Sequence, residues 1–150
     1  MKIPFSPPDI TDEEIKEVTE VLKSGWITTG PKTKELERKI AEFCHTDRAV
    51  ALNSATACME MALRLFEIGP GDEVIVPAYT YTASASVVAH VGATIKLVDV
   101  GADSYHIDYD KLEELITDKT KAIIPVDIAG VMVDYDRIRD VVMDKKGLFK

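Results

Sequence analysis

The chain has 150 residues, of which 46% are hydrophobic and 29% charged, and its formal net charge at pH 7 is −8. This length and apolar content are typical of one globular domain with its own core and unlike those of a disordered chain. The negative charge, without any cluster of Lys and Arg, argues against a nucleic-acid-binding surface.

The first residues, MKIPFSPPDITDEE, carry acidic groups early and lack the apolar segment of a signal peptide. No apolar run approaches the length needed to cross a membrane. The two cysteines, Cys44 and Cys58, lie in apolar helical patterns, so we predict buried free thiols in a reducing compartment. No Cys or His spacing indicates a metal site. We therefore predict a cytoplasmic protein with no metal.

Two amphipathic helices are predicted before residue 45. The first opens with the capping box TDEE at 11–14 and ends near Gly25, and the second covers residues 34–44. The loop between them contains Trp26 and Ile27 among Gly and Thr, and large apolar groups in a loop need a partner. Trp26 either packs into the core or a neighbouring subunit, or forms a wall of a binding pocket; the sequence leaves both open.

A strand, a tight turn and a helix are predicted over residues 48–66. The run AVAL at 49–52 has strand character, and good helix formers follow the polar turn at 53–56. The start of such a helix presents unpaired N–H groups and the positive end of the helix dipole, which suit a phosphate. The alternative is that Asn53 or Ser54 only caps the helix.

The rest of the chain alternates strands at 73–77, 94–100 and 121–126 with helices at 82–91, 110–116 and 134–144. Together with the strand and helix over residues 48–66, these make four alternations, which predict an α/β fold of three layers with a mainly parallel sheet covered on both faces. A ligand of such a sheet binds beyond the carboxyl ends of its strands. Those ends carry the turn at 53–56, the segment PAYTY at 77–81, Asp99, and the segment DIAG at 127–130.

The turn at 53–56 lacks the glycines of a dinucleotide site, and the chain contains neither a P-loop nor a GxSxG elbow. The ligand class that remains has a single phosphate group and a flat ring, for which Tyr81 offers a stacking face. Pyridoxal 5'-phosphate (PLP) is the common cofactor of that shape. The alternative for Tyr81 is a half-buried core aromatic.

Ordered segments along the whole chain resemble one family. They are PFS at 4–6 with the helix start EEI at 13–15, SGWITTGP at 24–31, NSATA at 53–57, GxGDEVIVP at 69–77, GAT at 92–94, VDV at 98–100 and TKAIIPV at 120–126. This set is similar to the DegT/DnrJ/EryC1/StrS family of PLP-dependent nucleotide-sugar aminotransferases.

The resemblance implies the large domain of the aspartate aminotransferase fold (fold type I), truncated, and a homodimer with the active site at its interface. The expected cofactor-binding residues are the phosphate-binding turn and the ring-stacking aromatic: Ser54, Ala55, Thr56 and Tyr81. The expected nucleotide-sugar pocket is lined by the loop residues Trp26, Ile27, Thr28, Thr29 and Gly30. Residues 1–45 would supply the N-terminal helices and loop, and residues 46–150 the βα array.

The activity implied is transfer of an amino group, from glutamate, to a nucleotide-linked keto sugar, as in polysaccharide biosynthesis. The family's Schiff-base Lys and its pyridinium-pairing Asp are expected downstream of Lys150. The chain is therefore interpreted as a piece cut inside an α/β array, with a strand beginning at Leu148. No catalytic residue is assigned within it, and it is expected to be inactive alone.

One position departs from the family pattern, because Asp127 stands where many relatives have His. Two alternatives stay open: a PLP-dependent sugar dehydratase of the same family, in which His replaces the Lys, and a non-catalytic phosphate-binding or regulatory domain. A nucleotide-binding dehydrogenase is disfavoured, since no glycines follow the first predicted strand.

Overall fold

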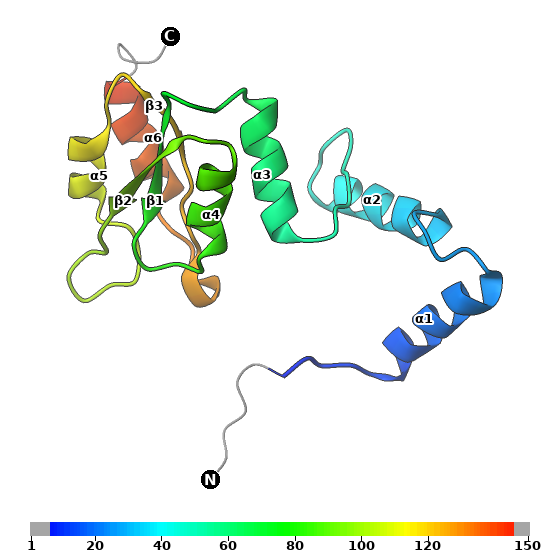
Figure 1. Ribbon diagram of the computed structural model, residues 1–150. Helices are drawn as coiled ribbons and strands as arrows, with labels where there is room; N and C mark the ends of the chain where they lie inside the picture. Colours follow the sequence, from blue (N-terminus) through cyan, green and yellow to red (C-terminus); the bar gives the residue numbers. More distant parts are fainter. Residues whose placement is uncertain (1–6, 146–150) are drawn as a thin grey trace. The chain divides into compact units, whose positions relative to one another are not determined.

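The computed structural model describes residues 7–145. The chain divides into two compact units, Met1–Ala51 (unit 1) and Leu52–Lys150 (unit 2) (Figure 1). Residues 4–6 and the strand predicted from Leu148 lie outside the described residues. Unit 1 contains α1 (Asp12–Ser24) and α2 (Pro31–Phe43). Unit 2 contains α3 (Ala55–Leu65), β1 (Glu73–Pro77), α4 (Ala83–His90), β2 (Thr94–Val98), α5 (Tyr109–Leu115), β3 (Thr120–Ile123), η1 (Ile128–Gly130) and α6 (Tyr135–Asp144).

The helices of unit 1 begin and end at local signals. Thr11 and Glu14 form the predicted capping box of α1, and Gly25 ends that helix with φ 74°, in the left-handed region. α2 begins at Pro31, earlier than the predicted residue 34. Proline is favoured at the first position of a helix, because an N–H at that position would have no acceptor within the helix. Neither helix has a buried residue. Their apolar stripes are exposed: Ile15, Val18 and Leu22 on α1, and Leu36, Ile40 and Phe43 on α2.

Unit 2 is built on a parallel three-stranded sheet in the order β2-β1-β3. The central strand β1 is apolar over Val74, Ile75 and Val76, which are fully buried. A strand covered on both faces needs apolar side chains on both, and β-branched residues suit the pleat. The predicted parallel α/β architecture is confirmed for this unit.

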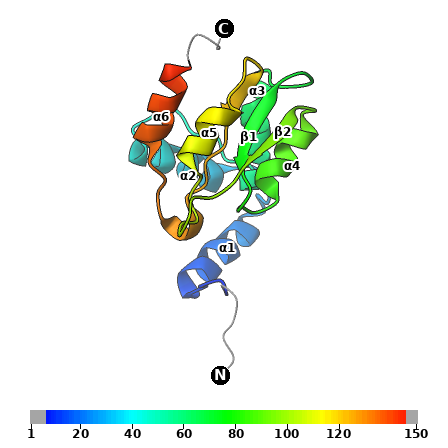
Figure 2. The same cartoon turned by 90° about the vertical axis from the view of Figure 1, so that its left-hand side faces the viewer.

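Two hydrophobic cores flank the sheet. Val74 and Val76 pack with Leu63 of α3 and with Val87 and Val88 of α4. On the opposite face, the core contains Ile75, Ile107, Leu112 of α5, Val133 and Ile138 of α6. The sheet therefore separates α3 and α4 from α5 and α6, as Figures 1 and 2 show.

Two predictions about individual segments are wrong. Residues 49–52 form no strand, and Val50 is exposed, because no strand among the described residues pairs with them. A strand exists only through the ladder it makes with a neighbour. Cys44 and Cys58 are free thiols, as expected, but both are exposed: α2, which Cys44 caps, buries no residue, and α3 buries only Leu63. Among residues 7–145, no helix is long and apolar enough to cross a membrane.

Candidate functional site

The turn predicted to bind phosphate is the amino end of α3. Ser54 is the N-cap, in extended conformation, and its Oγ accepts a hydrogen bond from the Ala57 N–H at 3.1 Å. The hydroxyl oxygen therefore caps the helix, which was the plainer interpretation, while its proton stays free to be donated. Within residues 7–145, the N–H groups of Ala55 and Thr56 make no hydrogen bond. Capping and anion binding are compatible at this turn.

The charges on α3 suit an anion at this end. No acidic residue lies in its first turn, and Arg64 lies in its last turn. The positive end of the helix dipole is therefore not neutralised by a carboxylate, which favours a bound anion there. Ser54 and Ala55 are exposed and small, so a phosphate can approach the backbone closely. The donor set, two amides and the hydroxyls of Ser54 and Thr56, fits a phosphate group.

Tyr81 lies in the loop between β1 and α4 in the same unit and is 80% exposed. Its carbonyl accepts a hydrogen bond from the Ser84 N–H at 3.1 Å, which anchors its backbone to the first turn of α4. Such exposure does not fit the alternative of a half-buried core aromatic, and it leaves a ring face for stacking. The amino ends of α3 and α4 lie at the same end of unit 2 (Figure 1).

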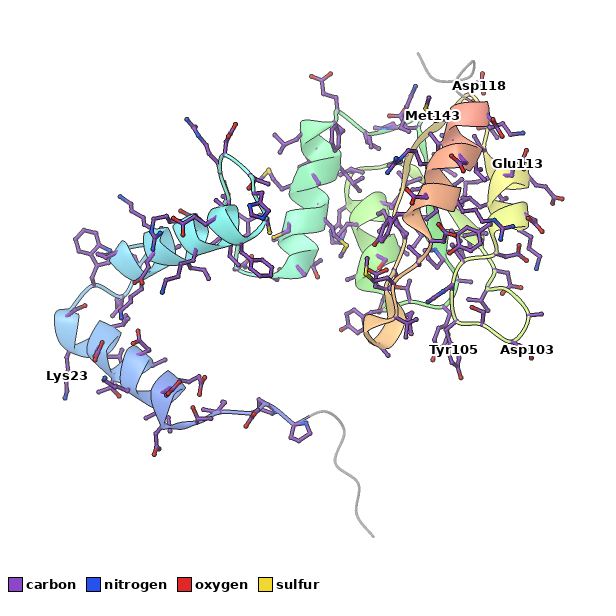
Figure 3. The ribbon with its side chains drawn as sticks, turned by 180° about the vertical axis from the view of Figure 1, so that it is seen from behind. Lys23, Asp103, Tyr105, Glu113, Asp118 and Met143 are labelled. Carbon is purple, nitrogen blue, oxygen red and sulfur yellow. The ribbon has the colours of Figure 1, made fainter. Side chains whose placement is uncertain are left out.

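A pair of aromatic rings joins two loops at this end of the sheet. Tyr79 follows β1, Tyr105 follows β2, and their ring centroids are 5.2 Å apart with 29° between the planes. Figure 3 shows Tyr105 and Asp103 on the loop after β2, at the same end of the unit as η1. This ring pair was not predicted from the sequence. A Tyr in each of two loops that follow adjacent parallel strands was the available signal.

Asp127 follows β3 and holds the next loop closed. Its carboxylate accepts hydrogen bonds from the Val133 N–H and from the Tyr135 hydroxyl, both at 2.9 Å. The first hydrogen bond fixes the backbone of Val133, whose side chain packs in the core. The second raises the pKa of Tyr135 above its ordinary value. Both carboxylate oxygens thus have partners within the chain. The acid that departs from the family pattern has a structural role here.

The predicted nucleotide-sugar loop, residues 26–30, belongs to unit 1. The Trp26 Nε1 donates a hydrogen bond to the Thr29 carbonyl at 3.0 Å, and the Trp26 N–H donates to the Ser24 Oγ at 3.1 Å. The indole is nevertheless 58% exposed. It lines a cavity of about 520 Å³ between the end of α1 and the start of α2. Trp26 therefore borders a hollow within unit 1, and its role as the wall of a binding pocket stays a prediction.

The five loop residues divide between two hollows. Trp26, Thr28 and Gly30 line the cavity of about 520 Å³. Ile27 lines a separate hollow with Val18 and Leu22. Thr29 contributes its carbonyl to the indole. The structure thus brings Ser54, Ala55, Thr56 and Tyr81 into unit 2 and residues 26–30 into unit 1. Within residues 7–145 no cluster of His, Cys, Asp or Glu could hold a metal ion.

The parallel sheet between two helical layers defines unit 2 as an α/β fold, with two N–H groups at the start of α3 that are unpaired among the described residues and an exposed Tyr81 in the loop before α4. The chain matches the DegT/DnrJ/EryC1/StrS aminotransferase family over residues 8–149 and belongs to it. The prediction from the ordered segments is confirmed.

Among curated relatives, the chain is 44% identical over 128 residues to the spore coat polysaccharide biosynthesis protein SpsC of Bacillus subtilis. It is 46% identical over 128 residues to the UDP-4-amino-4-deoxy-L-arabinose–oxoglutarate aminotransferase of Shewanella sediminis. Each match covers 85% of this chain and 33% of the relative. The chain therefore spans about a third of the length of these relatives.

Among solved structures, Spr1654 of Streptococcus pneumoniae, assigned as a sugar aminotransferase, is 61% identical with a TM-score of 0.95 in its PMP form. That match covers 100% of this chain and 38% of the other. The same protein has been solved in a PLP form and an apo form. The expected fold, that of the fold type I PLP-dependent aminotransferases, is confirmed over the part that this chain covers.

Proposed function

We propose that this chain is the N-terminal part of the large domain of a PLP-dependent aminotransferase that moves an amino group, from glutamate, to a nucleotide-linked keto sugar. The observation that carries the proposal is the amino end of α3, where Ala55 and Thr56 present unpaired N–H groups. A phosphate donor set of this kind, in a chain of this family, supports PLP as the cofactor.

In this proposal, unit 2 binds the cofactor. The amides of Ala55 and Thr56 and the Ser54 hydroxyl bind the phosphate, and the exposed Tyr81 ring stacks on the pyridine ring. PLP, when bound, supplies an electron sink for breaking bonds at the amino-bearing carbon. The contribution of these residues is binding and orientation, since Ser54 is already fixed by its hydrogen bond to the Ala57 N–H.

Unit 1 binds the nucleotide-linked sugar through residues 26–30. Support comes from the cavity of about 520 Å³, which has the size of a small-molecule site and is bounded by Trp26 and Pro31 with a few polar groups. The name of one relative, the UDP-4-amino-4-deoxy-L-arabinose–oxoglutarate aminotransferase, agrees with this substrate class.

The proposal includes a second copy of the chain. The apolar stripes of α1 and α2 are exposed, and apolar surface of this extent on amphipathic helices is usually covered by another surface. A homodimer with the active site at its interface would cover it. A reducing cytoplasm suits the two exposed free thiols.

We place the Schiff-base Lys and the pyridinium-pairing Asp in the part of the relatives' length that this chain does not cover. The 150-residue chain alone is then expected to be inactive. Glutamate-dependent transamination by the isolated chain would contradict this assignment.

The test uses the full-length protein and its PLP absorbance. Reconstituted protein should show the absorbance band of bound PLP, and addition of glutamate should shift it as the cofactor accepts the amino group. The double variant Ala55→Pro/Thr56→Pro removes both free N–H groups and should weaken PLP binding by at least about tenfold. Control variant Ala89→Ser lies on an exposed position near the other end of α4 and should bind PLP normally.

A full-length protein that binds no PLP would overturn the proposal. A protein that binds PLP but leaves glutamate unreacted, and instead removes water from a sugar nucleotide, would replace transamination with the dehydratase reaction.

A further inference from the structure

The Trp26 indole is held in one position by three features of its own loop. Two hydrogen bonds fix its ring nitrogen and its backbone N–H, to Thr29 and Ser24 respectively. The third feature is Gly30, because a Cβ built there would lie 2.4 Å from the Trp26 Cδ1 and 2.5 Å from its Nε1. The indole lies directly against the Gly30 backbone, in space that a side chain would fill. The ring is therefore ordered before any ligand arrives, which lowers the entropic cost of binding to it.

Most polar groups around the cavity already have partners. The Ser24 hydroxyl donates to the Val21 carbonyl at 2.7 Å and accepts from the Trp26 N–H. Lys32 pairs with Glu17 and, at 3.6 Å, with Glu20. These groups offer little to a new ligand without losing an existing bond.

Two hydroxyls remain. Within the part of the chain that the structure describes, the side chains of Thr28 and Thr33 make no hydrogen bond, and both line the cavity. The cavity thus offers one fixed aromatic face, apolar walls from Val21 and Pro31, and two hydroxyls. A hexose carries hydroxyls around its whole ring and has no flat face to match the indole, whereas this lining has only two unpaired hydroxyls among the described residues. A planar heterocycle with a few edge groups fits better.

We propose that Trp26 is the stacking platform for the nucleobase of the nucleotide-linked substrate, and that Gly30 is the positioning residue that keeps it in place. The hydroxyls of Thr28 and Thr33 then serve the carbonyl and ring-nitrogen groups at the edge of the base. This inference rests on the proposed function for the presence of a nucleotide, and it names the part of the substrate that unit 1 binds.

The chain contains one Trp, so its intrinsic fluorescence reports this site alone. Titration of the 150-residue chain with uridine, and with uridine 5'-monophosphate, should quench the Trp26 emission with saturation. Glucose 1-phosphate and inorganic phosphate should leave it unchanged at the same concentrations. Quenching by glucose 1-phosphate and not by uridine would assign the platform to the sugar and overturn the proposal.

Gly30→Ala tests the positioning role. The Gly30 backbone is extended, with φ −149°, so alanine adopts it without strain and the effect comes from the Cβ against the indole. The variant should shift the Trp26 emission spectrum and weaken uridine 5'-monophosphate binding by about tenfold, the order of one lost stacking contact. Gly69→Ala is the matched control, because its Cβ meets only the Val91 carbonyl oxygen at 3.6 Å, an ordinary contact. It should bind like the unchanged chain.

Trp26→Ala, followed by calorimetry, gives a second measurement that does not depend on fluorescence. It should lose uridine 5'-monophosphate binding while helix content, measured by circular dichroism, is retained. Unchanged affinity in Trp26→Ala or in Gly30→Ala would overturn the proposal.

The full-length protein separates this inference from the proposed function. Gly30→Ala should raise KM for the sugar nucleotide and leave the PLP absorbance band unchanged. PLP binding and transamination with no change in that KM would retain the function and reject the platform. Uridine-dependent quenching in a protein that binds no PLP would retain the platform and reject the function.

Discussion

The two units use apolar residues in opposite ways. Unit 2 buries them in two cores on either side of β1, and its central residues Val74, Ile75 and Val76 are fully buried. Unit 1 has an apolar stripe on α1 and another on α2, and neither helix buries any residue. Helical periodicity alone therefore shows that a face needs a partner, and it does not show which surface provides one.

The largest effect is expected from a core substitution in unit 2. Ile75→Ala should lower the free energy of unfolding by about 2–5 kcal/mol, because it leaves a cavity between the sheet and α5. Ile15→Ala, in the exposed stripe of α1, should change it by less than about 0.5 kcal/mol in the isolated chain. Urea unfolding followed by circular dichroism measures both. Equal losses of unfolding free energy in the two variants would contradict the difference in burial between unit 1 and unit 2.

An intermediate effect is expected on self-association. Phe43, at the end of the α2 stripe, is 83% exposed. In the full-length protein, Phe43→Asp should raise the dissociation constant of the proposed dimer by about tenfold or more, since it would place a charge in the apolar contact. Glu42→Gln changes the neighbouring charge and keeps the stripe, so it should associate normally. Sedimentation equilibrium measures the molecular mass of both variants in solution. A dimer mass for Phe43→Asp equal to that of the unchanged protein would show that the α2 stripe is not part of the interface.

A smaller effect compares the two helix caps. Thr11→Ala in unit 1 and Ser54→Ala in unit 2 each remove an N-cap oxygen and should each lower the free energy of unfolding by about 1 kcal/mol. Only Ser54→Ala should also weaken PLP binding in the full-length protein, measured by absorbance titration. If Thr11→Ala weakened PLP binding as much, the loss would reflect stability and not a phosphate contact.

The smallest effect concerns the loop held by Asp127. The hydrogen bond from Tyr135 raises the pKa of that phenol, so the folded chain holds this proton more tightly than the unfolded chain does. The associated stability is present in full below the unfolded tyrosine pKa of about 10 and is lost as pH rises through the folded value. Asp127→Asn should move the Tyr135 pKa toward its ordinary value. Absorbance at the tyrosinate band, with Tyr135→Phe to assign the step, measures this, and an unmoved step in Asp127→Asn would exclude the carboxylate as its cause.

The starts of α1 and α3 and the end of α1 could be predicted from sequence because their causes are local. Thr11 with Glu14, Ser54 ahead of Ala57, and Gly25 at φ 74° each act within one turn of the chain. The strand β1 could also be predicted, since a continuous β-branched run is required when both faces are covered. The candidate site followed partly from this regularity, because loops after parallel strands meet at one edge.

Contacts between distant residues could not be predicted in this way. The ring pair of Tyr79 and Tyr105, and the hydrogen bonds of Asp127 to Val133 and Tyr135, depend on how loops meet in space. The position of Trp26 depends on the Thr29 carbonyl and on Gly30. Residues 49–52 show the opposite case, a predicted element that does not form. Their pattern indicates a strand, yet a strand forms only when it pairs with a second segment. No segment among the described residues pairs with residues 49–52. Sequence determined what each segment can form, and tertiary structure decided which segments find a partner.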